Sequence, residues 1–383
     1  MPEYIAKTLF GLENVLAEEL RSLGAEGINI LNRAVSFSGD KKLLYLANYK
    51  LRTALKILVP ISEGDIKNEQ ELYDYVRTVK WDRYFGVNDT LAVEVSMNTA
   101  LFTHTQYIAQ KIKDAVVDQF RDKYGSRPSV DLENPTLRIN AYINDRKVSI
   151  SRDSSGDSLH RRGYRERQGP APLNEVLAAG LIKLSGWNAK IPLVDFMCGS
   201  GTIPIEAAMM ASGIPPGDLR ADYGFRKWKD YDPALFNQIV NEKKVYTGEP
   251  IQIYASDITP DSVRLAQRHA QNAGVFNYIK FQTTHFADVR PPQAPGMMII
   301  NPPYGERIVQ QNLNELYSSI GDKLKKDFSG YDAWILSANA DAMKSIGLRP
   351  SPKVIVYNGQ LECRFNRYSL YAGSKKVAKT GDS

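Results

Sequence analysis

The sequence predicts an α/β fold in its second half, with a mostly parallel, doubly wound sheet, preceded by an α+β region. Two observations predict this. From residue 173 onward, short apolar runs alternate with segments of helical periodicity, which is typical of a parallel sheet covered by helices on both faces. Before Ile150, strand-like runs alternate with only a few amphipathic helices. The length of 383 residues suits two or three domains.

Bulk composition excludes several classes of protein. No apolar run approaches the roughly 20 residues of a membrane-spanning helix, and Met1 to Phe10 lacks the features of a signal peptide. The 2 cysteines and 4 histidines predict neither a disulfide framework nor a metal site. The net charge of +6 is compatible with a polyanionic partner without requiring one. We therefore expect a soluble, cytoplasmic, metal-free protein.

The first 155 residues predict two small α+β regions. In residues 1–53, an extended run from Tyr4 to Thr8 precedes a helix over Leu12–Leu23, which Gly24 ends, and a further strand. In residues 54–155, strand-like runs such as Thr90–Val95 surround an amphipathic helix with Ile108 and Phe120 on its apolar face.

Residues 156–172 are polar and basic and predict an interdomain junction. Arg161, Arg162, Arg165 and Arg167 outweigh Glu166 by three charges. Such a run is commonly a solvated linker, but arginines also bind phosphates, and Tyr164 among them offers an aromatic surface to a base. The sequence leaves both interpretations open.

The predicted catalytic domain covers residues 173–375, with a tail over 376–383. An amphipathic helix begins near Pro172 and carries Leu173, Leu177 and Leu184 on one face. The predicted parallel strands are Leu193–Asp195, Ile253–Ala255, Ile279–Phe281, Met297–Ile300 and Trp334–Leu336. Runs at Val354–Tyr357 and Leu361–Arg364 flank Asn358-Gly359, which predicts an antiparallel hairpin that closes the sheet.

A candidate nucleotide-binding constellation follows the first two of these strands. Strand, acidic residue, glycine turn and helix occur in the order expected at the ligand-binding edge of an open α/β sheet. Asp257 can accept hydrogen bonds from ribose hydroxyls, Ile258 can cover an adenine, and Asp288 can bind its amino group. Alternatives are a plain tight turn, a helix cap at Asp257 and a loop aspartate at Asp288. The candidate turn residues are Asp195, Cys198, Gly199, Ser200, Gly201 and Thr202.

A dinucleotide site is disfavoured because the third glycine of its fingerprint is missing after Gly201. Cys198 has no histidine or second cysteine nearby in sequence, so we interpret it as a packing residue rather than a nucleophile.

The candidate catalytic residues are Asn301, Pro302, Pro303 and Tyr304, directly after an apolar strand. Two prolines fix the backbone and stop the strand. Methylation of an exocyclic amine requires its nitrogen to be held near tetrahedral geometry, in line with a sulfonium. The side-chain oxygen of Asn301 and the carbonyl of Pro302 are two suitable acceptors, and Tyr304 can stack on a flipped-out base. The alternative is a proline turn capped by asparagine.

With these motifs assembled, the chain resembles the THUMP-containing 23S rRNA guanine-N2 methyltransferases over nearly its whole length. The segments that carry the resemblance are Ser155-Gly156-Asp157-Ser158-Leu159-His160-Arg161-Arg162-Gly163-Tyr164-Arg165, Ala171-Pro172-Leu173-Asn174-Glu175, Met197-Cys198-Gly199-Ser200-Gly201-Thr202 and Asn301-Pro302-Pro303-Tyr304-Gly305-Glu306-Arg307. Phe196 departs from the family pattern, in which proline commonly follows the aspartate.

The resemblance implies a ferredoxin-like region (1–53), an RNA-binding THUMP domain (54–155) and a class I Rossmann-like methyltransferase domain with a seven-stranded sheet. It also implies S-adenosylmethionine as cofactor and RNA, in the form of 23S rRNA or a ribosome-assembly intermediate, as partner. RNA contact then becomes the expectation for Arg161, Arg162, Tyr164 and Arg165.

The implied reaction is methylation of guanine N2. One rival is adenine N6 methylation of DNA or RNA, because the catalytic motif suits any exocyclic amine. A second is a non-catalytic RNA-binding or ribosome-assembly protein. The sequence identifies neither the target nucleotide nor the oligomeric state, and it assigns no role to the insertion from Met210 to Val245 around Trp228.

Overall fold

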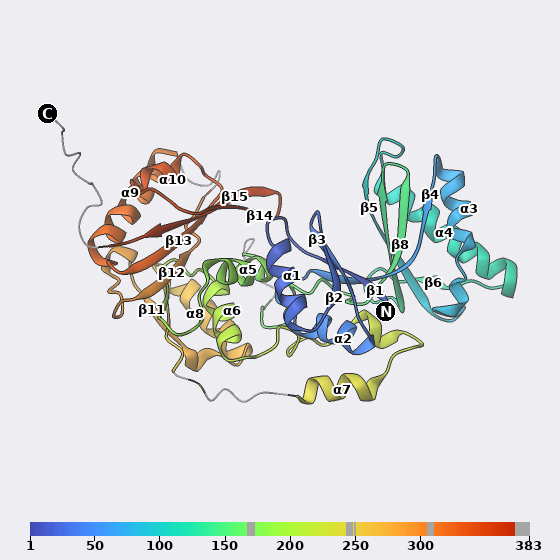
Figure 1. The fold of residues 1–383 in the computed structure, drawn as a ribbon, viewed down its shortest axis with the longest axis horizontal. Coiled ribbons are helices and arrows are strands. Elements are labelled where there is room, and N and C mark those ends of the chain that lie inside the picture. Colours follow the sequence, from blue (N-terminus) through green and yellow to red (C-terminus); the bar gives the residue numbers. More distant parts are fainter. Residues whose placement is uncertain (167–172, 243–247, 249, 305–309, 372–383) are drawn as a thin grey trace. The chain divides into compact units, whose positions relative to one another are not determined.

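The computed structural model describes residues 1–166, 173–242, 248, 250–304 and 310–371. Contacts between residues divide the chain into two compact units. The first unit contains Met1–Gly163 and Pro215–Lys244, and the second contains Tyr164–Ile214 and Val245–Ser383. Figure 1 shows the elements of both units. No helix among the described residues is long and apolar enough to cross a membrane.

The first unit is built on one eight-stranded sheet with the order β2-β3-β1-β4-β8-β7-β5-β6. Strand β4 pairs antiparallel with both β1 and β8 and so joins the two regions predicted on either side of residue 54 into one sheet. The strands are β1 (Glu3–Lys7), β2 (Glu26–Leu31), β3 (Ala34–Ser38), β4 (Lys56–Asp65), β5 (Thr90–Asn98), β6 (Ser129–Val130), β7 (Leu137–Asn144) and β8 (Lys147–Asp153).

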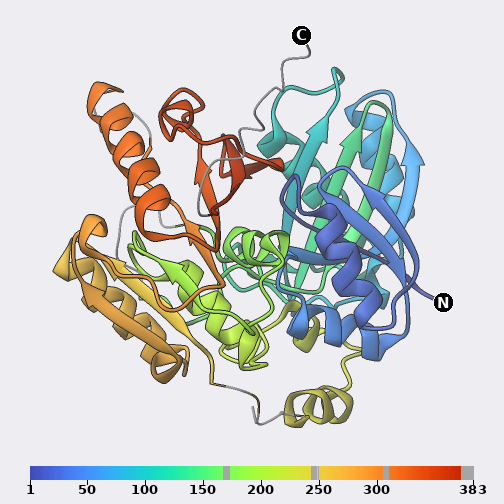
Figure 2. The same cartoon turned by 60° about the vertical axis from the view of Figure 1, so that its left-hand side comes forward.

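The helices of this unit bury their apolar faces in one core with the sheet. Leu16 of α1 and Leu44 of α2 share this core with Tyr4 and Ala6, which lie on the same face of β1. Figures 1 and 2 show the blue helices α1 and α2 beside the blue strands of this sheet. Asp40 caps α2 by accepting from the Leu43 amide. The helices are α1 (Glu13–Ser22), α2 (Lys41–Lys50), α3 (Glu69–Thr78), α4 (Thr105–Tyr124), α7 (Pro233–Asn241) and the short 3-10 helices η1 (Trp81–Arg83) and η2 (Gly224–Lys227).

Residues 215–242 pack with the first unit, although the sequence predicts them inside the catalytic domain. The ring of Phe225 stacks on Tyr45 at 4.5 Å between centroids. The Arg152 guanidinium lies 4.0 Å from the ring centroid of Trp228, a cation–π contact. The insertion therefore belongs structurally to the N-terminal unit, because its aromatic side chains complete that unit's core.

The second unit confirms the predicted class I sheet. Its seven strands have the order β11-β10-β9-β12-β13-β15-β14, parallel except for β15, which runs antiparallel to β13 and β14. The hairpin turns at Asn358-Gly359, where Gly359 has φ +65°. The strands are β9 (Leu193–Asp195), β10 (Ile253–Asp257), β11 (Ile279–Thr283), β12 (Gly296–Ile300), β13 (Tyr331–Ser337), β14 (Lys353–Asn358) and β15 (Leu361–Ser369).

Helices cover this sheet as the alternating pattern predicts. Leu313 and Tyr317 of α9 pack with Met343 of α10 on side chains of β9, β12 and β13. Helix α5 begins at Glu175, where Asn174 accepts from two main-chain amides, and the expected start at Pro172 lies outside the described residues. The helices are α5 (Glu175–Ser185), α6 (Thr202–Ala211), α8 (Pro260–Asn272), α9 (Gln310–Asp327), α10 (Ala342–Ser345) and the 3-10 helices η3 (Phe276–Tyr278) and η4 (Phe286–Asp288).

Candidate active site

The carboxyl ends of three adjacent parallel strands bring the main predicted residues together. β9 pairs with β10 on one side and with β12 on the other. Asp195 and Asp257 are the last residues of β9 and β10, and Asn301 directly follows β12. Open α/β sheets bind their ligands at this edge.

The glycine turn after β9 is fixed by the main chain. The Cys198 amide donates to the Ser256 carbonyl (3.0 Å), and the Gly201 amide donates to the Cys198 carbonyl (2.8 Å). Gly199 and Gly201 have φ of +52° and +83°, which favours glycine at both positions. A Cβ on Gly201 would lie 2.8 Å from the Ala266 Cβ, whereas one on Gly199 would meet no described atom within 4 Å. Open space therefore lies over Gly199, so a ligand can approach its backbone.

The Asp257 carboxylate ties this turn to the start of α8. One oxygen accepts from the Gly199 amide (3.0 Å), and the other accepts from the Thr259 amide (2.9 Å). The N-cap residue of α8 is Thr259, so Asp257 is not the helix cap considered as its alternative role. Ile258 beside it is 63% exposed, so its side chain is accessible to a ligand.

Asp195 is buried, and its carboxylate accepts from the Met197 amide at 3.1 Å. Desolvation by burial is the main cause that raises the pKa of Asp195 to about 8, and the charge of Asp257 adds to it. Asp195 is therefore mostly protonated at neutral pH in the free protein.

This pKa predicts a pH-dependent stability. Because the folded pKa lies above the unfolded value, the folded state binds more protons between about pH 4 and pH 8, and the free energy of unfolding falls as pH rises through that window. Asp195→Asn should remove this contribution, on the order of 5 kcal/mol across the window. Urea unfolding of both proteins at a series of pH values, without ligand, measures it; two parallel pH profiles would contradict it.

The remaining turn residues are held from several sides. Burial raises the pKa of the Cys198 thiol, which keeps it protonated and agrees with a packing role. His269 Nδ1 donates to the Ser200 carbonyl (3.1 Å), and the buried Thr202 hydroxyl accepts from Arg165 Nη2 (2.7 Å). Asp288 is exposed on η4, which follows β11.

The Asn301 side-chain oxygen is buried and accepts no hydrogen bond from any described residue. Pro302 is buried and Pro303 is exposed. A buried amide oxygen without a donor is costly, and such atoms are typical of sites that receive a ligand donor. Residues 305–309 of the same motif lie outside the described part of the chain.

Tyr304 is anchored by the antiparallel hairpin. Asn358 Nδ2 at the end of β14 donates to the Tyr304 hydroxyl at 3.0 Å, and Cys363 Sγ on β15 lies 3.9 Å from the same oxygen. Burial is the main cause that raises the pKa of Tyr304.

Comparison with known proteins identifies three consecutive segments. Residues 3–58 match the RlmL ferredoxin-like domain, residues 67–153 match the THUMP domain, and residues 162–367 match the RMKL-like methyltransferase domain. The chain belongs to the RMKL-like methyltransferase family.

Relatives of this methyltransferase family match nearly the whole chain. The Synechocystis sp. protein named "Putative RNA methyltransferase slr0064" is 39% identical over 96% of this chain and 97% of its own length. Ribosomal RNA large subunit methyltransferase K/L of Shewanella amazonensis is 38% identical over 98% of this chain, which spans only 54% of that protein. The crystal structure of SMU.472 complexed with SAH has a TM-score of 0.87 and 26% identity, and the match covers 97% of this chain and 99% of that one. The chain thus has an S-adenosylmethionine-dependent methyltransferase fold.

Two of the four residues expected to contact RNA are buried, which corrects that expectation. Arg162 is 1% exposed and donates to the carbonyls of Leu159 (2.7 Å) and Arg52 (2.5 Å). Tyr164 is also 1% exposed, and its hydroxyl donates to Glu206 (3.2 Å). Neither side chain offers a surface to RNA, because each stabilises the fold beneath it.

The other two residues expected to contact RNA, Arg165 and Arg161, differ in their exposure and in their partners. Arg165 forms an ion pair with Glu175 at 2.8 Å and donates to the Leu173 carbonyl at 2.6 Å, so it ties the start of α5 to the glycine-turn helix through Thr202. Arg161 remains largely exposed and pairs with Asp157 at 3.2 Å. The expected linker over 156–172 is thus ordered as far as residue 166, and 167–172 lie outside the described residues.

Sequence reasoning missed the contribution of Asn358 and Cys363 to the active site. The Asn358-Gly359 pair predicted a hairpin turn, but nothing in the sequence indicates which residue the turn contacts. Among the described residues, no group of three histidine, cysteine, aspartate or glutamate side chains could hold a metal ion.

Proposed function

We propose that the chain transfers a methyl group from S-adenosylmethionine to the exocyclic N2 amine of a guanine in 23S ribosomal RNA. The observation that carries the amine chemistry is the buried Asn301 oxygen at the carboxyl end of β12, which accepts no hydrogen bond from the residues that the structure describes. It lies next to the strand that carries the glycine turn. Such an oxygen is suited to accept a hydrogen bond from an N–H of the substrate.

The residues of the glycine turn fit S-adenosylmethionine. Each Asp257 oxygen accepts one main-chain amide and keeps a lone pair that can accept a ribose hydroxyl. The space over Gly199 admits the cofactor close to the backbone, and exposed Ile258 can cover the adenine. Asp288 is exposed and can accept from the adenine amine. When bound, the cofactor supplies a methyl group on a positively charged sulfur, which is already an activated donor.

The chain's own residues then position the amine. Asn301 Oδ1 and the Pro302 carbonyl accept hydrogen bonds from its two N–H groups and hold the nitrogen near tetrahedral geometry. Tyr304 offers a face for the flipped-out base, with stacking worth about 1 to 3 kcal/mol. Alignment supplies most of the acceleration, and no general base is needed in the transition state. After the transfer, the cofactor is left as the neutral thioether SAH, and the methylated nitrogen loses one proton to solvent.

The RNA target rests on the N-terminal unit and the relatives. The THUMP match and the relatives named as RNA methyltransferases favour RNA over DNA. Guanine N2 rests on the family resemblance, since Asn301 and Tyr304 would serve adenine N6 equally well. A ribosomal RNA substrate would place the protein in the cytoplasm.

Mass spectrometry of RNA nucleosides tests this function. We expect the purified protein, with S-adenosylmethionine and unmodified 23S rRNA, to produce N2-methylguanosine, and a deletion strain to lose it at one position. N6-methyladenosine in its place would favour the adenine reaction. No methylated nucleoside from a protein that binds SAH would refute the RNA substrate.

A further inference from the structure

A cavity in the first unit lies between two segments that the proposed function leaves without a role. These are residues 155–163 after β8 and residues 219–227 of the insertion. The volume of the cavity is about 500 Å³. Pockets for small ligands usually have about 300 to 1,000 Å³. Its walls come from residues 133–135 before β7, from residues 155–163 after β8 and from residues 219–227 of the insertion. The second wall belongs to one of the segments that carry the family resemblance.

Two cations that line the cavity bind neutral partners. Lys227 Nζ donates to the main-chain carbonyls of Asn134 (2.9 Å) and Pro135 (3.2 Å) and to the Asn134 side chain. Arg220 uses both terminal nitrogens in the same way. Its acceptors, at 2.9 to 3.4 Å, are the carbonyls of Ser155, Asp157, Ser158 and Arg161. Within the described ranges, neither Arg220 nor Lys227 forms an ion pair. The carboxylates of Asp153 and Asp157 act on Arg220, and that of Asp131 acts on Lys227, only from a longer distance.

Most carboxylates around the cavity are already opposed by arginines. Asp157 pairs with Arg161 at 3.2 Å, and Asp222 lies 3.9 Å from Arg226. The remaining lining carboxylate, Glu133, is exposed to solvent. Burial lowers the pKa of Arg220, which reflects the cost of a desolvated guanidinium that a bound anion would relieve. The cavity therefore favours an anion.

The walls are preformed because main chains touch where glycines leave no side chain. A Cβ on Gly163, which has φ +108°, would lie 2.4 Å from the Leu219 carbonyl oxygen. A Cβ on Gly224 would lie 2.6 Å from the Asp153 carbonyl oxygen. The insertion thus packs directly on the loop after β8, and no larger residue fits at these contacts.

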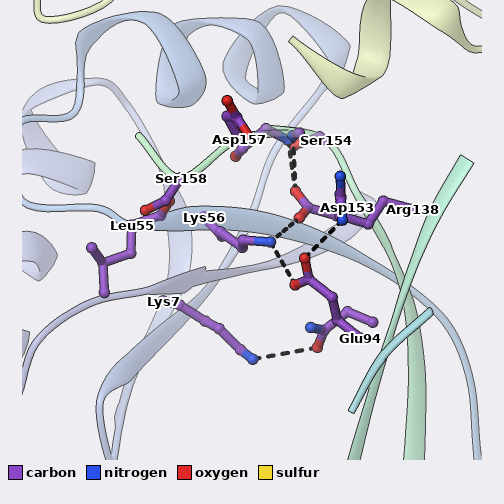
Figure 3. Close-up of polar contacts among 12 residues, drawn as sticks. Lys7, Leu55, Lys56, Glu94, Arg138, Asp153, Ser154, Asp157 and Ser158 are labelled. Atoms are coloured by element: carbon purple, nitrogen blue, oxygen red, sulfur yellow. Dashed lines mark hydrogen bonds and ion pairs between the residues drawn. The ribbon is translucent and has the colours of Figure 1, made fainter. Parts of the chain in front are cut away.

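A partly buried charge network holds the same loop in place (Figure 3). Asp153 is fully buried and accepts from the amides of Ser155 (2.9 Å) and Gly156 (3.2 Å). Lys56 binds Asp153 at 2.7 Å and Glu94 at 2.6 Å. Glu94 in turn pairs with Arg138, a lining residue of the cavity, at 2.9 Å. The network holds both Arg138 and the amides of the loop in place.

We propose that this cavity binds a phosphodiester of the RNA substrate, with Arg220 and Lys227 as its cationic groups and Arg161 at its rim. The proposal rests on the proposed RNA substrate and names a contact site outside the methyltransferase sheet. Arg220 and Lys227 attract the phosphate by their charge, because their N–H groups already donate to acceptors of the walls. The exposed Arg161 guanidinium can donate to phosphate oxygens. A preformed pocket binds without an added cost of ordering.

Ala221 allows a test that keeps the walls intact. It is exposed and lines the cavity, and only its main-chain carbonyl is hydrogen-bonded, to Arg226 at 3.2 Å. Ala221→Glu places a negative charge in the cavity, and Ala221→Gln is the matched neutral control. With the full chain and a fluorescent single-stranded RNA oligonucleotide, anisotropy should give about tenfold weaker binding for the glutamate variant and less than about twofold for the glutamine variant.

A second pair of variants measures the phosphate contact itself. Lys227→Gln should reduce the slope of log affinity against log salt by about 0.7, the value for one phosphate of a single strand. Lys229→Gln is the control, since Lys229 also donates to one main-chain carbonyl, that of Asp82 at 2.9 Å, but does not line the cavity. Equal effects of the two lysine changes would indicate diffuse attraction and overturn the proposal.

The outcomes separate this inference from the proposed function. If Ala221→Glu and Ala221→Gln bind RNA equally while methylation proceeds, the cavity is not the contact and the inference fails alone. The opposite result is that Ala221→Glu binds RNA more weakly and keeps its SAH affinity in calorimetry, but neither this variant nor the unchanged protein methylates RNA. In that case the proposed function fails and the site stands. If inorganic phosphate binds in the cavity but does not compete with RNA, the proposal is also overturned.

Discussion

Asn301→Ala should lower kcat by about 10²- to 10³-fold while the affinity for SAH stays within about twofold of the unchanged protein. The side-chain oxygen of Asn301 is buried and receives no hydrogen bond from the described residues, so its loss costs the fold little and removes one of the two acceptors for the target amine. The measurement is single-turnover methyl transfer to RNA at saturating cofactor, with SAH titrated by calorimetry.

Two further variants sharpen this result. Asn301→Asp keeps an acceptor oxygen and should recover part of the lost rate. Asn366→Ala removes another buried amide of the same sheet, on β15, and should change kcat by less than about twofold if the effect at Asn301 is chemical rather than structural. Equal losses of kcat and SAH affinity in Asn301→Ala would contradict its assignment to the amine.

Asp257→Ala should weaken SAH binding by at least about 10²-fold, because hydrogen bonds to a charged group contribute about 1.5 to 3 kcal/mol each. The change removes the proposed acceptor for the ribose hydroxyls and also the anchor of the Gly199 amide. Calorimetry measures the affinity directly. The rise in melting temperature with saturating SAH should shrink in parallel, since a ligand stabilises the folded state in proportion to its binding.

Asp261→Ala is the matched control for Asp257→Ala. It removes a carboxylate four positions later, in the first turn of α8, where the side chain is 84% exposed and pairs only locally with Arg264. Its SAH affinity should stay within about twofold of the unchanged protein. An unaltered affinity in Asp257→Ala would leave that aspartate with a purely structural role in the turn.

The hydrophobic periodicity of the sequence and the positions of its glycines and prolines predicted the scaffold of the candidate active site. The alternation of apolar runs and helices indicated a parallel sheet, and such a sheet places the carboxyl ends of its strands at one edge. Asp195, Asp257 and Asn301 therefore meet at adjacent strand ends although they are far apart in the chain. The antiparallel hairpin was predicted from Asn358-Gly359, because this dipeptide favours a tight turn between two strands.

Burial of polar side chains was beyond the sequence, because it depends on contacts with distant segments. Arg162 and Tyr164 belong to a basic, polar stretch that resembles an RNA-binding surface, yet Arg52 and Glu206 hold them inside the protein. A run of arginines shows charge but not which guanidinium is covered. Only Arg161 of the four candidates keeps an exposed side chain that RNA can reach.

The sequence by itself determined the order of the elements, the glycine turn and the candidate catalytic tetrapeptide, since each depends on backbone preferences of neighbouring residues. The tertiary structure alone decided that Asn358 holds Tyr304 across 54 positions, that the insertion completes the N-terminal unit and that a cationic cavity forms where it does so. These features join segments remote in the chain, and no local pattern of hydrophobicity or charge encodes which partner a side chain meets.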